Sequence, residues 1–160
     1  IYKNPKIYLY VWLISIPLSV VGGSSWSTFI AEIGLEDRTS GYLTNSEGNL
    51  GQFSQTGFRF DFLVYSGAPV LAGAYFILKK KITDSFYVHI FGIYCISNAF
   101  WILVITAAFS NRFAYLSWFL MPVILAYPMF RFKVWKEQYK VFGAILFFYF
   151  MFTYFMHVIK

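Results

Sequence analysis

SFYVHIFGIYCISNAFWILVITAAF, residues 85–109, is an unbroken apolar stretch without aspartate, glutamate, lysine or arginine. A helix needs roughly 20 mostly apolar residues to cross the hydrocarbon core of a bilayer, and this stretch is long enough. Ser97 and Asn98 lie near its middle. Polar side chains at that depth usually find hydrogen-bond partners on neighbouring helices. We therefore expect residues 85–109 to cross a membrane and to pack against other helices.

The composition of the whole chain also indicates that lipid surrounds it. Of the 160 residues, 59% are hydrophobic, 24% aromatic and only 12% charged, whereas an average soluble domain carries about a quarter charged residues. This excludes an ordinary soluble domain and a disordered chain. The single cysteine, Cys95, excludes an internal disulfide and a cysteine-based zinc site. The net charge of +6 comes from basic residues placed between apolar segments, so we expect no nucleic-acid partner.

Further apolar segments flank this stretch on both sides. Together with it they predict an all-α, polytopic membrane helix bundle of about five transmembrane helices, over residues 7–21, 60–78, 85–109, 113–130 and 141–159. Pro17, Pro69 and Pro122 fall inside predicted spans, where proline usually marks a kink. Because the chain begins with Ile1, we expect residues 1–160 to be a single transmembrane domain from the C-terminal portion of a longer chain.

Basic residues orient the predicted spans. With the N-terminus inside, nine of the thirteen lie at cytoplasmic ends: Lys3, Lys6, Lys79, Lys80, Lys81, Arg131, Lys133, Lys136 and Lys140. The opposite orientation would violate the positive-inside rule. Residues 22–57 then form one long extracytoplasmic loop. Within it, Trp26, Phe29, Ile30 and Ile33 recur at helical spacing and predict a short helix lying in the outer interface.

Two arginines occupy equivalent positions at the outer side. Arg59 immediately precedes the span at 60–78, and Arg112 immediately precedes the span at 113–130. Both would lie at helix N-termini, which carry partial positive charge and unpaired N–H groups. A guanidinium there adds a fork that matches phosphate oxygens, so the pair predicts an anion site for phosphate or pyrophosphate. The simpler alternative is that each arginine snorkels to the lipid headgroups.

Several carboxylates and one further arginine could complete such a site. Asp61, two residues after Arg59, could orient that arginine or act as a general base for an acceptor hydroxyl; alternatively, it makes local hydrogen bonds at the helix start. Asp37 and Arg38 in the long loop could face a sugar substrate, or form a solvated charge pair of little energetic weight.

Aromatic residues and a histidine lie at the same predicted depth. Tyr115 and Trp118 could stack on sugar rings, although both residue types favour the membrane interface in any case. His157, near the outer end of the last span, could be a base or a phosphate contact, or an ordinary interface residue. The sequence predicts no metal site and no cofactor.

Two segments that carry the arginines resemble a known family. GFRFDFLVYS at residues 57–66, followed by Pro69, and SNRFAYLSWF at residues 110–119, followed by Pro122, resemble patterns of EpsG-like membrane proteins. These proteins are grouped with the Wzy-type polymerases of bacterial exopolysaccharide, capsule and O-antigen synthesis. The second segment is the more specific of the two.

The resemblance implies a multi-pass protein of the bacterial inner (cytoplasmic) membrane. Such a polymerase transfers the growing glycan from its polyprenyl pyrophosphate onto the next lipid-linked oligosaccharide repeat unit, at the outer face, without a nucleotide sugar or an essential metal. Arg59 and Arg112 would then stabilise the leaving pyrophosphate, and Asp61 would take the hydroxyl proton. Expected partners are polyprenyl-pyrophosphate-linked oligosaccharide, membrane lipid, a chain-length regulator and other polysaccharide-assembly proteins.

Two other functions fit the same sequence. A translocase or export component for lipid-linked glycans would use the arginines to bind pyrophosphate without chemistry. A non-catalytic partner subunit would pack through its proline-containing helices and would tolerate replacement of the outer arginines. The absence of charge in the middle of the predicted spans favours chemistry at the outer face over a translocation path.

Overall fold

The computed structural model of the chain describes residues 4–32, 58–107, 110–155 and 158. Every regular element in this part is helical, which confirms the all-α prediction. In chain order the elements are α1 (Pro5–Gly22), α2 (Ser25–Glu32), α4 (Phe60–Ala74), the π-helix η2 (Tyr75–Lys79), α5 (Ser85–Leu103), α6 (Ser110–Trp118), α7 (Met121–Arg131) and α8 (Gln138–Tyr154).

Four helical stretches are long and apolar enough to cross a membrane: Pro5–Gly22, Phe60–Lys79, Ser85–Leu103 and Arg112–Arg131. They correspond to the first four predicted spans. The fifth predicted span, 141–159, coincides with α8, which has 17 residues and ends at Tyr154. Because residues 156–157 and 159–160 lie outside the described part, a crossing by this segment stays a prediction.

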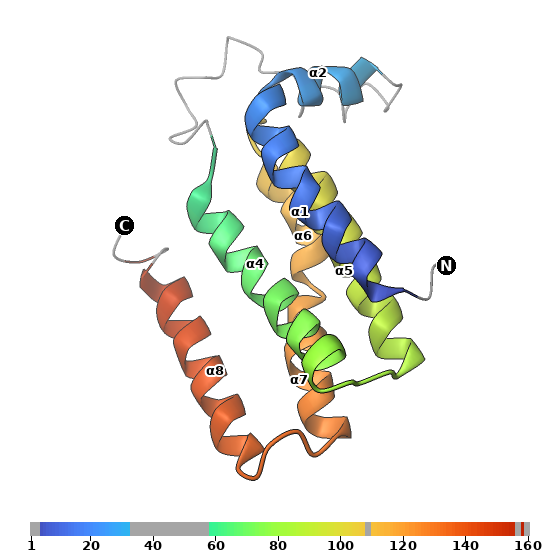
Figure 1. Ribbon diagram of the computed structural model, residues 1–160. Coiled ribbons are helices and arrows are strands. Elements are labelled where there is room, and N and C mark those ends of the chain that lie inside the picture. Colours follow the sequence, from blue (N-terminus) through green and yellow to red (C-terminus); the bar gives the residue numbers. More distant parts are fainter. Residues whose placement is uncertain (1–3, 33–57, 108–109, 156–157, 159–160) are drawn as a thin grey trace.

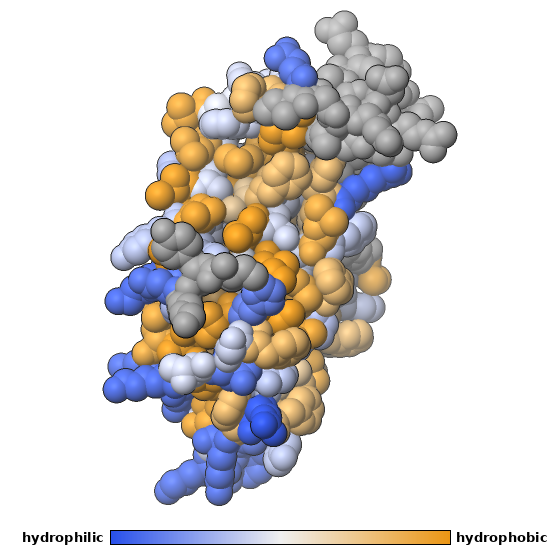
Figure 2. All heavy atoms as spheres, turned by 90° about the vertical axis from the view of Figure 1, so that its right-hand side faces the viewer, coloured by the Kyte–Doolittle hydropathy of each residue, from blue (hydrophilic) through white to orange (hydrophobic). Residues whose placement is uncertain are grey.

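The long helices alternate in direction along the bundle (Figure 1). α1, α5 and α8 run one way, and α4 and the α6–α7 pair run the other. The starts of α4 and α6 therefore share one end of the bundle, and the connections after η2 and α7 share the other. Figure 2 shows apolar side chains over most of the middle of one face, with hydrophilic ones gathering toward the lower end. The predicted orientation, with the N-terminus inside, stays a prediction.

α5 is the central helix of the bundle and comes from the charge-free stretch. It contacts α1, α4, α6 and α7. Its aromatic side chains Tyr87, Phe91, Tyr94 and Trp101 are all fully buried. A helix that is apolar on every side is normally surrounded by other helices or by lipid, and here 50% of it is buried against neighbouring helices.

A buried hydrogen-bond relay crosses the middle of the bundle. Trp12 Nε1 of α1 donates to Asn98 Oδ1 of α5 over 2.8 Å. Asn98 Nδ2 donates to Ser117 Oγ of α6 over 3.0 Å, and Ser117 Oγ donates to the carbonyl of Ala114. The expectation that Asn98 bonds to neighbouring helices is therefore confirmed. The relay links three helices through one amide.

Two predicted spans are interrupted in the structure. The helix expected over 85–109 ends at Leu103, and a tight turn follows in which Val104 N donates to Trp101 O over 3.1 Å. The span expected over 113–130 is divided into α6 and α7. Leu120 N donates to Ser117 O over 2.9 Å in a tight turn, and Pro122 falls in the first turn of α7, where its missing N–H costs no hydrogen bond.

The short helix predicted in the long loop forms as α2, which lies across the end of α1 (Figure 1). Trp26 Nε1 donates to the carbonyl of Leu18 over 2.8 Å and ties α2 to α1. Ile30 packs against the buried residues Val104 and Ala107. Ile33 lies outside the described residues.

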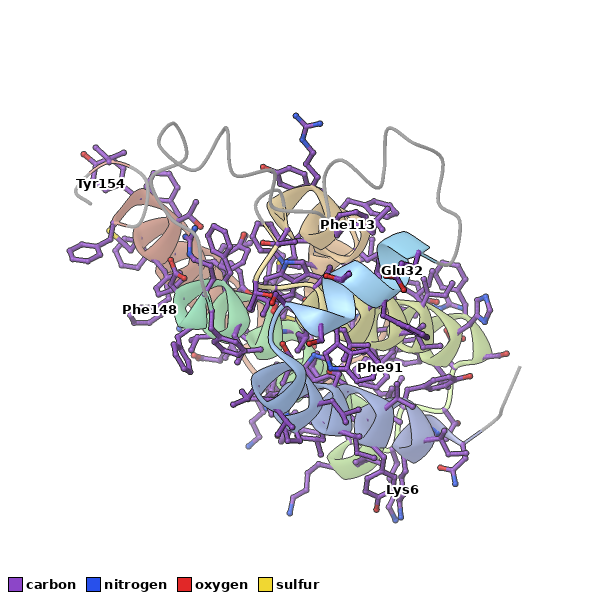
Figure 3. The ribbon with its side chains drawn as sticks, turned by 90° about the horizontal axis from the view of Figure 1, so that it is seen from above. Lys6, Glu32, Phe91, Phe113, Phe148 and Tyr154 are labelled. Atoms are coloured by element: carbon purple, nitrogen blue, oxygen red, sulfur yellow. The ribbon has the colours of Figure 1, made fainter. Side chains whose placement is uncertain are left out.

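Gly73 of α4 marks a close approach between helices. A methyl group added there would overlap the ring of Phe91 and would lie 3.3 Å from Ile124 Cγ2. Phe91 is fully buried at the centre of the bundle (Figure 3), so its ring has no space to withdraw. Gly143 of α8, in contrast, has nothing within 4 Å of an added methyl.

We therefore expect Gly73→Ala to lower the unfolding free energy by about 1–3 kcal/mol through overpacking. Gly143→Ala is the matched control and should leave stability unchanged or raise it by up to about 1 kcal/mol, because alanine is the better helix former. Thermal unfolding in detergent measures both. Equal effects of the two substitutions would contradict the close approach at Gly73.

A second prediction concerns the contribution of the hydrogen-bond relay to stability. Asn98→Leu leaves the buried indole N–H of Trp12 without its acceptor, and we expect a loss of about 1–3 kcal/mol of unfolding free energy. Ser97→Ala, at the half-buried neighbouring position, is the control and should change stability by less than about 0.5 kcal/mol. The same thermal measurement applies. If Asn98→Leu is as harmless as the control, the relay does not hold the helices together.

Candidate functional site

The first turn of α4 carries a paired arginine and aspartate. Arg59 is the residue that caps the helix start, and its side chain makes no capping hydrogen bond. Instead, its Nε donates to Asp61 Oδ1 over 3.0 Å and its Nη2 donates to Asp61 Oδ2 over 2.7 Å. This two-pronged, charge-assisted geometry is the strong form of an arginine–carboxylate pair. The guanidinium is therefore held in one orientation.

An aromatic ring fixes the same guanidinium from a second side. The Cζ atom of Arg59 lies 3.8 Å from the centre of the Phe62 ring. Arginine over an aromatic face is attracted by the ring quadrupole, more strongly where water is partly excluded. The side chains of Arg59 and Asp61 are only 23% and 21% exposed. The cation is thus partly buried, stacked and paired.

Trp118 of α6 joins this turn to the rest of the bundle. The rings of Phe62 and Tyr65 both lie 5.1 Å from the Trp118 ring, in edge-to-face geometry. Tyr115 contacts Trp118 at 5.7 Å, and the fully buried Trp101 contacts it at 6.1 Å. α4, α5 and α6 therefore meet at one indole. The sequence-predicted residues Arg59, Asp61, Tyr115 and Trp118 fall in one neighbourhood.

The indole N–H of Trp118 is itself unusual. Its Nε1 atom is buried and has no hydrogen-bond acceptor among the described residues. The same is true of Nε1 of the neighbouring Trp101, and both atoms are buried inside the bundle. Buried N–H groups nearly always have a partner.

Arg112 lies at the same end of the bundle as Arg59, because α4 and α6 run in the same direction (Figure 1). The sequence placed Arg112 just before its helix, but α6 begins at Ser110, so Arg112 occupies the first turn. Its side chain is exposed. Both arginines therefore remain close to a helix N-terminus, with different degrees of burial.

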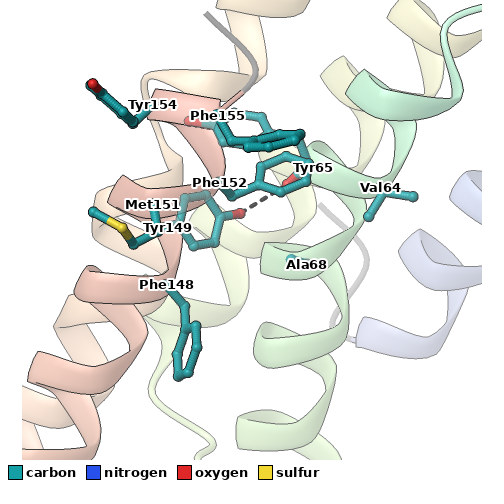
Figure 4. Close-up of a pocket in the computed structure, with 9 residues that line it drawn as sticks. All are labelled: Val64, Tyr65, Ala68, Phe148, Tyr149, Met151, Phe152, Tyr154 and Phe155. Carbon is teal, nitrogen blue, oxygen red and sulfur yellow. Dashed lines mark hydrogen bonds between the residues drawn. The ribbon is translucent and has the colours of Figure 1, made fainter. Parts of the chain in front are cut away.

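An apolar groove begins immediately below this cluster, between α4 and α8 (Figure 4). Its volume is about 700 Å³, and Val64, Tyr65 and Ala68 of α4 form one wall. The other wall comes from α8, including Phe148 and Phe152. At its base, Tyr149 Oη donates to the carbonyl of Tyr65 over 2.8 Å and bridges the two helices.

Tyr65 belongs to both the groove and the arginine cluster. Its ring packs on Trp118 on one side and lies 6.1 Å from the Phe152 ring, in parallel, on the other. Sequence analysis did not single out Phe62 or Tyr65. The sequence contained one indication of their contacts. Phe62 follows Arg59 by three residues and Tyr65 follows Phe62 by three, and side chains three residues apart on a helix are neighbours.

The remaining sequence-predicted residues cannot be compared with this geometry. Asp37, Arg38 and His157 lie outside the described residues. Within the described ranges, no group of three or more histidine, cysteine, aspartate or glutamate side chains is placed to hold a metal ion.

The arrangement can bind an amphiphile with an anionic head. The fixed cation of Arg59 and the helix start meet the head, and the groove accepts an apolar tail. We also compared the chain with protein-family models, with curated proteins and with solved structures. None of them matches it.

Proposed function

We propose that the chain belongs to a membrane glycosyltransferase that joins polyprenyl-pyrophosphate-linked oligosaccharide repeat units at the outer face of the bacterial inner membrane. One observation carries the proposal. The guanidinium of Arg59, fixed by Asp61 and Phe62, lies at the end of the helix whose next turns line the apolar groove. The resemblance of residues 57–66 and 110–119 to EpsG-like proteins supports the same function.

The depth of the two features suits a lipid-linked substrate. A helix rises about 1.5 Å per residue, so Val64 lies about 7–8 Å and Ala68 about 13–14 Å below Arg59 along α4. A phosphate group at Arg59 would thus stand at the boundary, and its isoprenoid chain could descend along the groove wall. α8, which forms one wall of the groove, lies at the edge of the bundle, where lipid would be its neighbour (Figure 3).

The proposed reaction breaks the bond between the anomeric carbon and the pyrophosphate oxygen. That carbon forms a new bond to the acceptor hydroxyl oxygen, the hydroxyl proton passes to a base, and polyprenyl pyrophosphate leaves with the bonding electrons. Negative charge therefore develops on the leaving group. Donors fixed before the reaction stabilise such charge most effectively, and the N–H groups of Arg59 that do not bond Asp61 meet that condition. Arg112, at the same end, is the second cation.

Asp61 can fill both roles that the sequence allowed. Each of its oxygens accepts one hydrogen bond from Arg59, and a carboxylate oxygen has a second lone pair that could take the proton of the acceptor hydroxyl. Through the same pair, Asp61 orients the guanidinium. Tyr115, which is 60% exposed, and the partly exposed ring of Trp118 offer ring faces to the sugars above the pyrophosphate.

Arginine replacement tests this function in the native host with the complete gene. We expect Arg59→Ala and Arg112→Ala to collapse the long glycan ladder to single repeat units. Arg59→Lys should also reduce polymer by about 10²–10³-fold, because an ammonium cannot form the two-pronged pair. Gel analysis of surface glycan, with protein level checked by blotting, is the measurement.

Lys136→Ala, an exposed charge at the other end of the bundle, is the control and should leave the ladder normal. A full-length ladder from both arginine-to-alanine variants, at normal protein level, would exclude the proposed chemistry. Loss of even single repeat units from the surface would indicate a translocase instead.

Filling the groove is an independent test. Ala68→Phe places a ring in the groove, and we expect shorter glycan chains with little change in protein level, because the isoprenoid tail loses space. Leu71→Phe adds a similar ring at a position that is 69% exposed and does not line the groove, so it should have no effect. The same glycan gel reports both variants. Identical chain lengths from the two would show that the tail does not use the groove.

A further inference from the structure

A second pocket lies at the opposite end of the bundle from Arg59. It is enclosed by residues 80–84, between η2 and α5, and by residues 131–134, between α7 and α8. Its volume is about 460 Å³. Its lining includes four cations, Lys80, Lys81, Arg131 and Lys133, and one carboxylate, Asp84. The pocket therefore combines a cavity with a net positive charge.

Lys80 is held in position within this pocket. Its Nζ donates to the carbonyl of Val134 over 3.2 Å, which connects the two loops. The same ammonium lies 5.5 Å from the centre of the Trp135 ring and 5.8 Å from that of Tyr75. This long side chain is thus already ordered in the free protein, so it loses little conformational entropy when a ligand binds.

Lys81 occupies a backbone conformation that favours glycine. Its φ of 54° makes it the one non-glycine residue of the described part with positive φ. Ile82 N donates to Phe76 O over 3.1 Å around it, in the pattern of a helix C-terminus that usually places glycine at this position. A lysine here costs conformational energy, and such strain tends to occur at functional positions.

The other loop is also fixed. Gln138 Oε1 accepts from Val134 N over 3.0 Å, and Gln138 Nε2 donates to Met129 O over 2.8 Å. Gln138 therefore ties the loop back to α7. Arg131 and Lys133, although exposed, project from a segment with a defined backbone.

Asp84 does not neutralise these cations by direct pairing. Its Oδ2 accepts hydrogen bonds from Tyr87 N at 3.0 Å and from Tyr127 Oη at 3.1 Å. Asp84 therefore caps the N-terminus of α5. Among the described residues, the ion pairs within 4.0 Å are Arg59–Asp61 and Lys140–Glu137, both outside the pocket. The pocket thus contains positive charge that an anion can compensate.

We propose that this pocket binds the phosphate of an anionic phospholipid headgroup. Two spanning helices, Phe60–Lys79 and Arg112–Arg131, end at its rim, which places it at headgroup depth. Leu78 and Phe130, one turn or less from the pocket, are 44% and 66% exposed on the outside of the bundle, where acyl chains would lie. Basic pockets between membrane helices recognise such headgroups. This lipid is distinct from the substrate proposed above, so neither proposal depends on the other.

The test measures lipid binding by the full chain, purified in neutral detergent. Phosphatidylglycerol and phosphatidylcholine are added separately, and retained lipid is counted by native mass spectrometry while melting temperature is followed. We expect phosphatidylglycerol to bind and to raise the melting temperature, and phosphatidylcholine to do neither. Arg131→Gln with Lys133→Gln should weaken phosphatidylglycerol binding by about fivefold for each cation removed.

The matched control is Lys136→Gln with Lys140→Gln, which removes the same charge from the same end of the bundle but outside the pocket. It should bind phosphatidylglycerol like the wild type. Equal loss in both double variants would show attraction by bulk charge and would overturn the pocket. Inorganic phosphate is the probe for a soluble ligand; stabilisation by phosphate alone, with no further effect of phosphatidylglycerol, would overturn the lipid as its source.

Lys81→Gly separates binding from folding. Because glycine suits the backbone at this position, the variant should melt at a higher temperature than the wild type without anionic lipid. It should nevertheless bind phosphatidylglycerol about fivefold more weakly, since one cation is lost. A variant that is more stable and binds as tightly as the wild type would remove Lys81 from the site.

Discussion

Asn98 is an amide in the middle of an apolar helix, and hydrocarbon offers it no partner. The surrounding structure follows from that constraint. Its oxygen accepts from Trp12 and its nitrogen donates to Ser117, so α1 and α6 are both held against α5. The residue after Ser117 is Trp118, whose ring packs edge-to-face against the ring of Phe62. The guanidinium of Arg59 in turn stacks on the face of Phe62. A single buried amide is therefore connected by direct contacts to the cation at the start of α4.

The two ends of the bundle use positive charge in different ways. At the end where α4 and α6 begin, Arg59 is paired with Asp61 and stacked on a ring, so its orientation is fixed and the net charge of the pair is reduced. At the other end, Lys80 is fixed by a carbonyl, and the neighbouring cations of its pocket lack a paired carboxylate among the described residues. Orientation matters where charge must develop at one atom during a reaction. Uncompensated charge matters where an anionic headgroup is to be held.

α8 is the least integrated of the long helices, and this has a consequence for the proposed site. None of its residues is fully buried, and it lies at the edge of the bundle beside α4 (Figure 3). Tyr149 and the aromatic contacts of Tyr65 hold it there. A helix attached at so few points leaves an apolar groove beside its neighbour instead of closing it, and Tyr65 lines that groove while its ring also contacts Trp118.

The sequence alone determined the membrane class, the helical fold and the approximate positions of the first four predicted spans, because hydrocarbon imposes length and polarity on every crossing segment. It also indicated the arginines at the starts of two helices and the need of Asn98 for partners. Only the tertiary structure decided that α5 ends at Leu103, that α6 and α7 are separate, and that Asp61 is paired with Arg59 through both oxygens. The stacking of Arg59 on Phe62, the groove beside Tyr65 and the pocket around Lys80 were equally beyond sequence analysis. Each depends on which faces of distant helices pack together. A helix that is apolar on all sides has no hydrophobic stripe from which its packing face could be predicted.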